Sequence, residues 1–465
     1  MSPSTATDSP ARAPAFSHYA PGFRRRRFRN WFFVGLLYAG YYLCRYNLST
    51  VTPELAREFN LNNAQTGWMS TARDLGYMVG QVINGLFSDA LGGKQSMAIG
   101  AGGTVLLNLA FGWFSSWDVA FILFGFVLIR ALDGYAQAFG APGMVKLNTA
   151  WFRRNERGTF AGIFGAMIQL GQVGANQLSR MLVAGGPVLL FGFSLFVLPK
   201  LGWRSMFIVP PIMLAVLLLL MWVNVRNYPE EAGYRIPHDD EAGSSHAPTP
   251  ERLPLRRVFV AIASNPLIWL NAGAYMCTGF VRRAYDYWWA KYLDNEWNIT
   301  KASPEFGWLG FLLPAAAVLG SFGAGFVSDK LFRSRRSPVA AALYGVESAV
   351  IFGGMLLVAH PQFGSPFLAC TFLTLISLTC NSSHSIIGTA AVMDIGGRQM
   401  AGFALGVVNS FQYLGAMLAG KALGELIDTF GWSALFWSML PFSLLGMSLM
   451  LGVWLVTRGR DVRGA

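Results

Sequence analysis

Long apolar runs recur along nearly the whole chain and alternate with short polar or basic segments. A helix of about 20 apolar residues crosses the roughly 30 Å hydrocarbon core of a bilayer, so each such run predicts a membrane span. Breaks at glycine, proline and charged residues separate the runs. Twelve spans are predicted, near residues 30–51, 64–88, 95–115, 118–140, 158–182, 203–225, 266–290, 305–328, 338–358, 366–390, 399–424 and 432–456.

One further apolar stretch, near residues 184–201, interrupts this pattern between the fifth and sixth spans. It reads GGPVLLFGFSLFVLPKLG. Together with its flanks it is too short for another pair of spans, so we expect a hairpin or an extension at the outer surface.

A polar segment rich in proline, serine and acidic residues follows the sixth span and reads as a flexible linker. It separates two sets of six spans. The predicted organisation is a cytoplasmic tail at 1–28, an N-terminal bundle at 29–226, the linker at 227–257, a C-terminal bundle at 258–457 and a cytoplasmic tail at 458–465.

The two halves also repeat in sequence, because a Gly-x-x-Ser-Asp element ends the second span at Asp89 and the eighth span at Asp329. Both aspartates stand beside basic residues at cytoplasmic helix ends, where a charge pair would latch one conformational state. The predicted fold class is therefore an all-α membrane protein, with twelve transmembrane helices in two pseudo-symmetric six-helix bundles around a central site.

Composition and charge agree with a protein that has the lipid bilayer as its partner. The 465 residues are 53% hydrophobic and 13% charged, which excludes a water-soluble fold. The net charge of +12 does not indicate nucleic acid, because the basic residues form short clusters between spans. Under the positive-inside rule these clusters put both termini in the cytoplasm. They comprise Arg24 to Arg27, Arg153, Arg154, Arg157, Arg256, Arg257, Lys330, Arg333, Arg335, Arg336, Arg398, Arg458 and Arg460.

Two arginines lie well inside predicted spans, Arg45 in the first and Arg282 in the seventh. A guanidinium in the middle of a membrane costs at least about 2.5–3.5 kcal/mol, so it generally faces a partner or a watery cavity. Its planar fork suits bidentate recognition of phosphate or carboxylate. Two such groups at matching positions predict a cationic site for a small anion near the pseudo-symmetry axis.

The alternative is that each buried arginine has a permanent carboxylate partner. Arg282 or Arg283 would pair with Asp286, and Arg73 with Asp74 or a neighbouring helix. The spacing of Arg130 and Asp133 on the fourth span also suits a local structural pair. Arg283 remains a further candidate for the substrate.

Other polar side chains are candidate lining groups of the same cavity. Tyr38 and Tyr42 precede Arg45 at helical spacing, and Tyr77 with Gln81 repeats the pattern on the second span. Tyrosine hydroxyls donate to oxyanions, although packing explains them equally well. His384 on the tenth span is a candidate substrate donor or proton-linked group, with a polar contact between helices as the alternative.

No pattern in the sequence indicates catalysis. The chain has no nucleophile triad, no metal-ligand cluster and no phosphate-cradling Gly-Lys-Ser/Thr loop. The four cysteines, Cys44, Cys277, Cys370 and Cys380, sit in apolar segments without metal-ligand spacing. We therefore predict neither an enzyme nor a cofactor or metal, and transport would be driven by ion or counter-substrate gradients.

With these residues located, the chain resembles the major facilitator superfamily and, more narrowly, its organophosphate:phosphate antiporter family. The narrower resemblance rests on YYLCRYN, LDGYAQAFGAPGMVK, WFRRNERG, RRAYDYWWAKYL, AGFALGVVNSFQYLGA and IDTFGW. It implies that Arg45 and Arg282 hold the substrate phosphate, with Tyr38, Tyr42 and Tyr77 lining the cavity. It further implies exchange of a sugar phosphate or glycerol phosphate for inorganic phosphate in a bacterial inner membrane.

The sequence leaves two other functions open. The chain also resembles anion:cation symporters that carry organic carboxylates, through NLSTVTPELAREFNLNNAQTGW and through Arg130 with Lys146. It departs from the antiporter pattern at Gln81, Ile168 and Ala141, where lysine, histidine and tryptophan are frequent in that family. Some members of the antiporter family are membrane sensors that bind a sugar phosphate and signal to a kinase, so a sensor kinase is a partner only under that alternative.

Overall fold

The computed structural model describes residues 21–117, 119–152, 157–190, 193–234, 263–332, 336–360, 362, 364–391 and 407–461. The first group of long helices is α1 (Phe23–Glu58), α2 (Asn63–Leu91), α3 (Gly93–Phe114), α4 (Ile122–Gln137), α5 (Gly140–Trp151), α6 (Arg157–Ser179) and α7 (Val209–Asn224). The second group is α9 (Pro266–Trp297), α10 (Pro304–Leu331), α11 (Arg336–Ala359), α12 (Pro366–Ser385), α14 (Lys421–Phe430) and α15 (Ser433–Asp461), with a further helical run at 407–418. Taking α4 with α5, and 407–418 with α14, each as one span, these helices match the twelve predicted spans.

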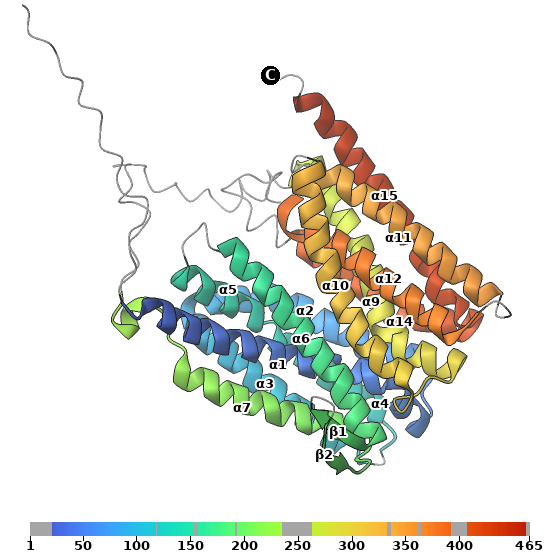
Figure 1. Ribbon diagram of the computed structural model, residues 1–465, viewed down its shortest axis with the longest axis horizontal. Helices are drawn as coiled ribbons and strands as arrows, with labels where there is room; N and C mark the ends of the chain where they lie inside the picture. The colour runs from blue at the N-terminus through green and yellow to red at the C-terminus, as the bar shows by residue number, and fades with distance from the viewer. Residues whose placement is uncertain are drawn as a thin grey trace, which may run out of the picture.

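Figure 1 shows the two groups side by side, α1–α7 in blue to green and α9–α15 in yellow to red. Within the first group α1 packs on α6 and α7, and α2 packs on α4. The second group repeats the arrangement, because α9 packs on α15 and α10 packs on α12. The groups meet through α1 with α9, α6 with α10 and α2 with α14.

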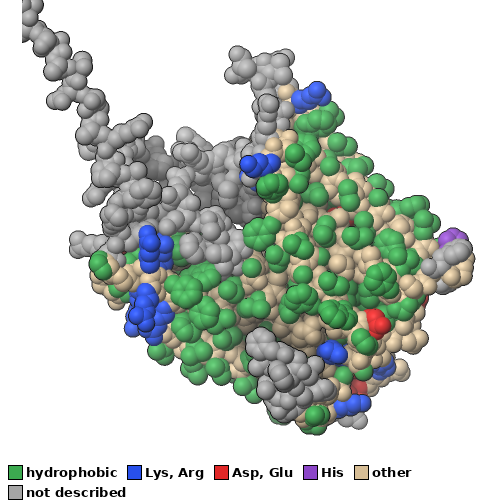
Figure 2. Space-filling model, in the orientation of Figure 1, with side chains coloured by type: hydrophobic (Ala, Val, Ile, Leu, Met, Phe, Trp, Pro, Cys, Tyr) green, Lys and Arg blue, Asp and Glu red, His purple; other side chains and the backbone are tan. Residues whose placement is uncertain are grey.

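The outer surface of the molecule is apolar, as a bilayer requires. Figure 2 shows hydrophobic side chains over most of the visible face, with lysine and arginine toward its edges. Seven helical segments of the described chain are long and apolar enough to span a membrane. In contrast, α1 and α9 are buried on nearly every side from residue 37 to 53 and from 277 to 293. The two most enclosed helices are thus those that carry Arg45 and Arg282.

Close crossings of helices repeat in the two groups and depend on glycine. A Cβ added at Gly134 of α4 would lie 2.0 Å from the Arg73 carbonyl oxygen of α2. At the corresponding crossing of the second group, a Cβ at Gly320 of α10 would lie 2.2 Å from the Leu378 oxygen of α12. Small residues let membrane helices approach to backbone contact. This contact fixes the position of α2 and α4 against each other, where their buried charges lie.

The fourth span is broken between α4 and α5, and it extends beyond the predicted end at residue 140. Pro142 has no backbone N–H and its ring crowds the carbonyl four residues earlier, at Ala138, where α4 ends. The helix resumes at Gly140 and continues to Trp151. The predicted end at residue 140 is therefore too early, because Pro142 kinks the span without ending it.

The apolar stretch near 184–201 forms the expected hairpin. A π-helical turn, η1 (Arg180–Ala184), leads into β1 (Gly186–Leu190), which pairs antiparallel with β2 (Phe193–Leu198). The short helix η2 (Trp203–Phe207) then leads into α7. The other short elements of the described chain are η3 (Pro229–Ala232), after α7, and η6 (Ile386–Ala391), which continues α12.

Hydrogen bonds join the two groups at one end of the molecule, which we call the closed end. It contains the last turns of α1, α6, α9 and α14 and the first turns of α2 and α10. The Asn176 side chain of α6 donates to the Gly310 oxygen of α10 at 2.8 Å. Arg57 of α1 donates to Asp294 of α9 at 2.9 Å. The Asp428 carboxylate of α14 accepts from the backbone N–H groups at the start of α2, at 2.8–2.9 Å.

Candidate functional site

Arg45 lies near the middle of α1 and has no carboxylate partner among the described residues. Its Nε donates to the side-chain oxygen of Gln137 on α4 at 2.8 Å. The guanidinium carbon lies 4.5 Å from the ring centroids of both Tyr42 and Tyr77. The residue is 5% exposed. Arg45 is therefore held by an amide and two aromatic faces, which leaves its full positive charge uncompensated.

Gln137 is positioned by a carboxylate behind it. Its side-chain nitrogen donates to both oxygens of Asp133, at 3.2 and 3.1 Å. Because the amide nitrogen faces Asp133, the amide oxygen is turned toward Arg45. The carboxylate also accepts from Arg130 at 3.1 Å and from Asn108 at 3.2 Å. Arg45 thus sits at the end of a buried hydrogen-bond network in which the charges of Asp133 and Arg130 cancel.

Arg282 occupies the matching place on α9 and also has no carboxylate partner among the described residues. Its Nη1 lies 3.1 Å from Nε2 of His384 on α12. A guanidinium can only donate, so this ring nitrogen accepts and the imidazole is neutral. Tyr275 stacks on the His384 ring, with centroids 5.2 Å apart, and its hydroxyl lies 3.4 Å from the same nitrogen. His384 therefore orients Arg282 without neutralising it.

The other three buried arginines near the middle of the spans each have an acidic partner. Arg283 donates to Asp286 at 3.3 Å, although it is adjacent to Arg282 in sequence. Arg73 pairs with Asp74. Arg130 pairs with Asp133, as the sequence spacing indicated. Five arginines and three aspartates are thus buried in this region of α1, α2, α4 and α9, which leaves a net charge of two positive units at Arg45 and Arg282.

Two of these carboxylates also connect the two groups of helices on the closed side of the site. Asp286 of α9 accepts from the Tyr46 hydroxyl of α1 at 3.2 Å and from Gln172 of α6 at 3.4 Å. Asp74 of α2 accepts from the Tyr287 hydroxyl of α9. Tyr46 follows Arg45 directly, and its partner Asp286 follows Arg282 by one turn of α9. The two unpaired arginines therefore border one central region, with these bridges between it and the closed end.

The predicted aromatic residues gather around Arg45. Tyr38 and Tyr42 have ring centroids 5.5 Å apart, and both are buried. Tyr77 contacts Arg45 directly, and Gln81 lies next to Tyr77 on α2. Of the predicted set, Arg45, Tyr38, Tyr42, Tyr77 and Gln81 thus lie together, and Arg282 with His384 forms the second cluster.

Sequence reasoning missed several residues that complete these clusters. They are Gln137, Tyr275 and Tyr413, whose ring lies 4.9 Å from that of Tyr77. Gln137 follows Asp133 by one helical turn, a signal that was available. Tyr275 precedes Arg282 by two turns of α9, which was also readable from the sequence. Tyr413 comes from a distant segment, and only the fold brings it to Tyr77. The side chains of Asp89 and Asp329 lie outside the described residues, so their predicted latching role stays a prediction.

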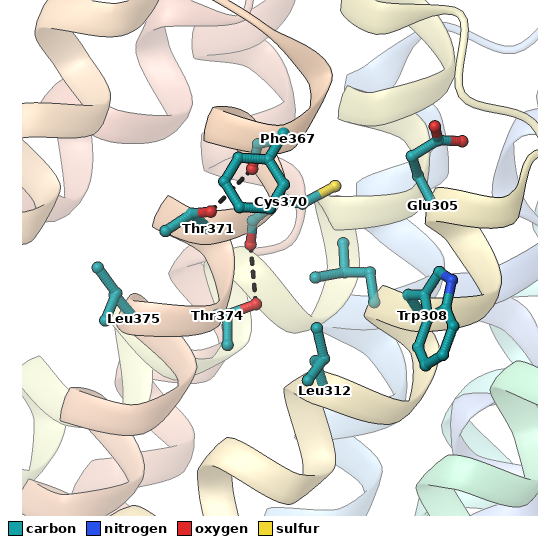
Figure 3. A pocket seen from close by; sticks show the side chains of 9 residues that line it. Glu305, Trp308, Leu312, Phe367, Cys370, Thr371, Thr374 and Leu375 are labelled. Carbon is teal, nitrogen blue, oxygen red and sulfur yellow. Dashed lines mark hydrogen bonds between the residues drawn. The ribbon is translucent and has the colours of Figure 1, made fainter.

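A separate groove lies on the outside of the second group, between α10 and α12, with a volume of about 440 Å³. Figure 3 shows Glu305 and Trp308 on one side and Phe367, Cys370 and Thr371 on the other. The Thr371 and Thr374 hydroxyls are bonded to carbonyls of their own helix, at 2.8 Å each. The groove therefore offers an anion one carboxylate and apolar walls, which makes it unsuitable for such a substrate.

Comparison with known proteins places these features in context. A family model described as Major Facilitator Superfamily matches residues 34–420 and, a second time, 272–464. The solved structure of a D-xylose-proton symporter superposes with a TM-score of 0.70 at 14% identity, covering 92% of this chain and 97% of that one. This likeness concerns the fold, and together with the family match it confirms the predicted class of twelve spans in two halves.

Curated relatives match over most of their length. The probable hexose phosphate transport protein of Chlamydia pneumoniae is 26% identical, covering 91% of this chain and 90% of its own. The membrane sensor protein UhpC of Escherichia coli K12 is 26% identical, with coverage of 87% and 86%. The glycerol-3-phosphate transporter of Bacillus subtilis is 26% identical, with coverage of 92% and 93%.

Proposed function

The chain belongs to the Major Facilitator Superfamily, and from that premise we propose that it exchanges a phosphorylated metabolite for inorganic phosphate across a bacterial inner membrane. The metabolite would be a sugar phosphate or a glycerol phosphate, as the names of the relatives suggest. One observation carries the proposal. Of the buried arginines in the middle of the spans, Arg45 and Arg282 alone lack a carboxylate partner among the described residues.

A phosphate monoester fits this site in charge and in shape. The two uncompensated guanidiniums match the two negative charges of a phosphate dianion. A guanidinium fork can donate two parallel hydrogen bonds to phosphate oxygens, whereas a lysine acts as a point charge. Tyr38 and Tyr42, which lie beside Arg45, would line the organic part, and His384 would hold Arg282 in place.

Transport would follow from alternating access of the two halves, 29–226 and 258–457, around this midplane site. With both termini in the cytoplasm, the closed end would face outward and the structure would correspond to an inward-facing state. Release of the contacts at the closed end, such as Arg57 with Asp294, would accompany opening to the outside.

The test is phosphate counterflow in proteoliposomes that contain the purified protein. Vesicles loaded with phosphate receive labelled phosphate outside, and the wild type is compared with Arg45→Lys. The lysine variant keeps the charge but loses the fork, so we expect exchange to be strongly impaired. Arg25→Lys, at an exposed position of the same helix, is the matched control and should exchange like the wild type.

Each other outcome points elsewhere. Normal exchange by Arg45→Lys would remove the basis of the site. No exchange by folded wild-type protein would favour either a proton- or sodium-coupled carboxylate symporter or a sensor. The sensor alternative has a specific support, since one relative is the membrane sensor UhpC. Co-purification with a membrane histidine kinase, without uptake of sugar phosphate, would establish it.

A further inference from the structure

The N-terminal bundle carries a group of positive charges at the end where α1 begins, and the proposed transport cycle does not use them. Figure 2 shows lysine and arginine side chains at this edge of the molecule, where Figure 1 shows the start of α1. Two guanidiniums meet there at Asn224, the last residue of α7. Arg26 donates through Nη1 to the Asn224 backbone oxygen at 2.8 Å, and Arg29 donates through Nε to its side-chain oxygen at 2.6 Å.

Two further cations lie beside this pair. Arg226 follows Asn224 by two residues, and its side chain is exposed. Lys94, at the start of α3, has its ammonium nitrogen 4.6 Å from the ring centroid of Trp222 on α7. Its backbone N–H donates to the side-chain oxygen of Asn227 at 2.9 Å, which ties α3 to the segment that carries Arg226. The four positive side chains form what we call the basic cluster: Arg26, Arg29, Lys94 and Arg226.

Acidic side chains do not compensate the basic cluster. None of its four members forms an ion pair with an acid in the described part of the chain. Residues 23–29, 94 and 226–231 together hold seven basic side chains and two acidic ones. One of these acids, Glu231, accepts instead from the backbone N–H of Asn227 at 3.1 Å. Burial and the neighbouring charges of Arg29 and Arg226 lower the pKa of Arg26, so the members of the cluster repel one another.

Capping of a helix end explains only part of this arrangement. The last carbonyls of a helix have no partner within it, so one arginine at Asn224 stabilises the end of α7. The positive-inside rule explains why basic residues are frequent at this end, but it does not require four of them to converge on one helix end. Arg29 keeps both terminal nitrogens, and Arg226 its whole guanidinium, without a partner among the described residues. These donors are available to an anion.

Exposed aromatic side chains place the basic cluster at the level of lipid headgroups. Phe28 is 59% exposed, Trp222 48% and Tyr228 49%. Aromatic residues are enriched where the hydrocarbon of a bilayer meets water. Phe28 precedes Arg29 directly and Trp222 contacts Lys94, so apolar and cationic surfaces adjoin. A ligand with both an anionic group and acyl chains uses both surfaces, whereas a soluble phosphate uses the cations alone.

We propose that the basic cluster binds the headgroup of an anionic phospholipid, whose acyl chains lie against Phe28 and Trp222. A phosphodiester accepts charge-assisted hydrogen bonds from guanidiniums, and its negative charge relieves the repulsion within the cluster. Phosphatidylglycerol has this chemistry without an amine, whereas the ammonium group of phosphatidylcholine adds a further positive charge. Under the predicted topology the lipid belongs to the cytoplasmic leaflet. It holds the start of α1, the helix that carries Arg45, against the end of α7.

Native mass spectrometry of the purified protein in detergent measures the binding of short-chain phosphatidylglycerol and of phosphatidylcholine with the same acyl chains. The wild type should bind phosphatidylglycerol more tightly. A basic residue near an anionic lipid surface contributes about fivefold in affinity, so Arg29→Gln with Arg226→Gln should weaken phosphatidylglycerol binding by about 25-fold and leave phosphatidylcholine unchanged. The control Arg180→Gln with Lys200→Gln removes two exposed charges at the opposite end of the bundle and should bind as the wild type does.

Further variants and a competing anion keep the outcomes distinct. Arg29→Lys with Arg226→Lys keeps both charges and should retain most of the binding. Equal affinity of the wild type for the two lipids, or equal loss in the lysine and glutamine variants, overturns the proposal. Displacement of the lipid by inorganic phosphate, at an ionic strength where chloride does not displace it, also overturns it, because the cluster would then serve a soluble anion. If phosphatidylglycerol binds only after Asp239→Asn with Asp240→Asn, the acidic linker occupies the cluster and the proposal is wrong. The lipid assay does not depend on transport, so a failure of phosphate exchange leaves its result unaffected.

Discussion

The assignment of Arg45 to substrate and of Arg130 to structure predicts different stabilities when each is replaced by methionine. Arg130→Met removes one partner of a buried ion pair in which Arg130 is 3% and Asp133 1% exposed. The Asp133 carboxylate would keep only the hydrogen bonds that the side-chain amides of Gln137 and Asn108 donate. Breaking a buried pair in this way costs about 3–5 kcal/mol, because a buried charge is left uncompensated.

Arg45→Met removes a positive charge that has no acidic partner among the described residues, so no carboxylate is left buried without a counter-charge. The variant loses one hydrogen bond to a charged group, about 2 kcal/mol. It also loses cation–π contacts with Tyr42 and Tyr77, about 1 kcal/mol each. Removal of an unpaired guanidinium from the membrane interior raises the free energy of unfolding by about 3 kcal/mol. The expected net destabilisation is therefore about 1 kcal/mol, well below that of Arg130→Met, although transport should be lost.

Reversible unfolding of the purified protein in mixed micelles measures both variants. The double variant Arg130→Met with Asp133→Leu removes both charges and should recover most of the stability lost by Arg130→Met. Phosphate at a hundredfold excess over its Kd should stabilise the wild type by about 2.7 kcal/mol, and Arg45→Met should not respond. The reasoning is refuted if Arg45→Met is as unstable as Arg130→Met, or if Arg130→Met unfolds like the wild type.

Two further predictions concern the closed end. A Cβ at Gly310 would lie 3.0 Å from that of Asn176. This distance is shorter than the spacing of about 3.8 Å in disulfides, so a small outward shift of α10 would accommodate the bond. The pair Asn176→Cys with Gly310→Cys should therefore cross-link and stop exchange until a reductant is added. Undiminished exchange by the oxidised protein would contradict a moving closed end. Burial alone would raise the pKa of Glu58, but hydrogen bonds from Arg204 and Trp203 lower it overall. The lowered pKa stabilises the folded state at pH values above the usual glutamate pKa of about 4.3. This contribution is lost as pH falls through the lowered pKa, so Glu58→Gln should flatten the acid side of a plot of unfolding free energy against pH. Identical plots for the variant and the wild type would count against the pair of Glu58 and Arg204.

The spans were predictable because bilayer thickness sets the length of an apolar helix, whatever it packs against. The same reasoning singled out Arg45 and Arg282 as candidates, since any guanidinium inside a span needs an explanation. It left Arg283, the next residue on the helix, as a further candidate. Adjacent residues point about 100° apart on a helix, so one faces His384 and the other faces Asp286. Which neighbour stands in each direction depends on how α9 packs, and no local pattern encodes it.

The same limit applies to the bridges between the two groups. Tyr46 and Asp286 are far apart in sequence, yet they form a hydrogen bond at 3.2 Å. Asp286 looked like a local partner for Arg283, which it is, but its contacts with α1 and α6 give it a second role. Local spacing predicts pairs within a helix, because geometry fixes them. Pairs between helices require the tertiary structure.

The charge balance explains why such a site would favour exchange over leakage. In the proposed cycle, reorientation of the empty carrier would bring Arg45 and Arg282 together in a drier interior. Two unit charges about 8 Å apart repel by about 2 kcal/mol at an effective dielectric of about 20. A bound dianion between them turns this repulsion into attraction, so the loaded carrier reorients more readily. The three arginines with acidic partners add little to the repulsion in the empty carrier or to the attraction in the loaded one, because their charges are already compensated. Under this proposal, selective coupling would depend on the two arginines that have no acidic partner among the described residues.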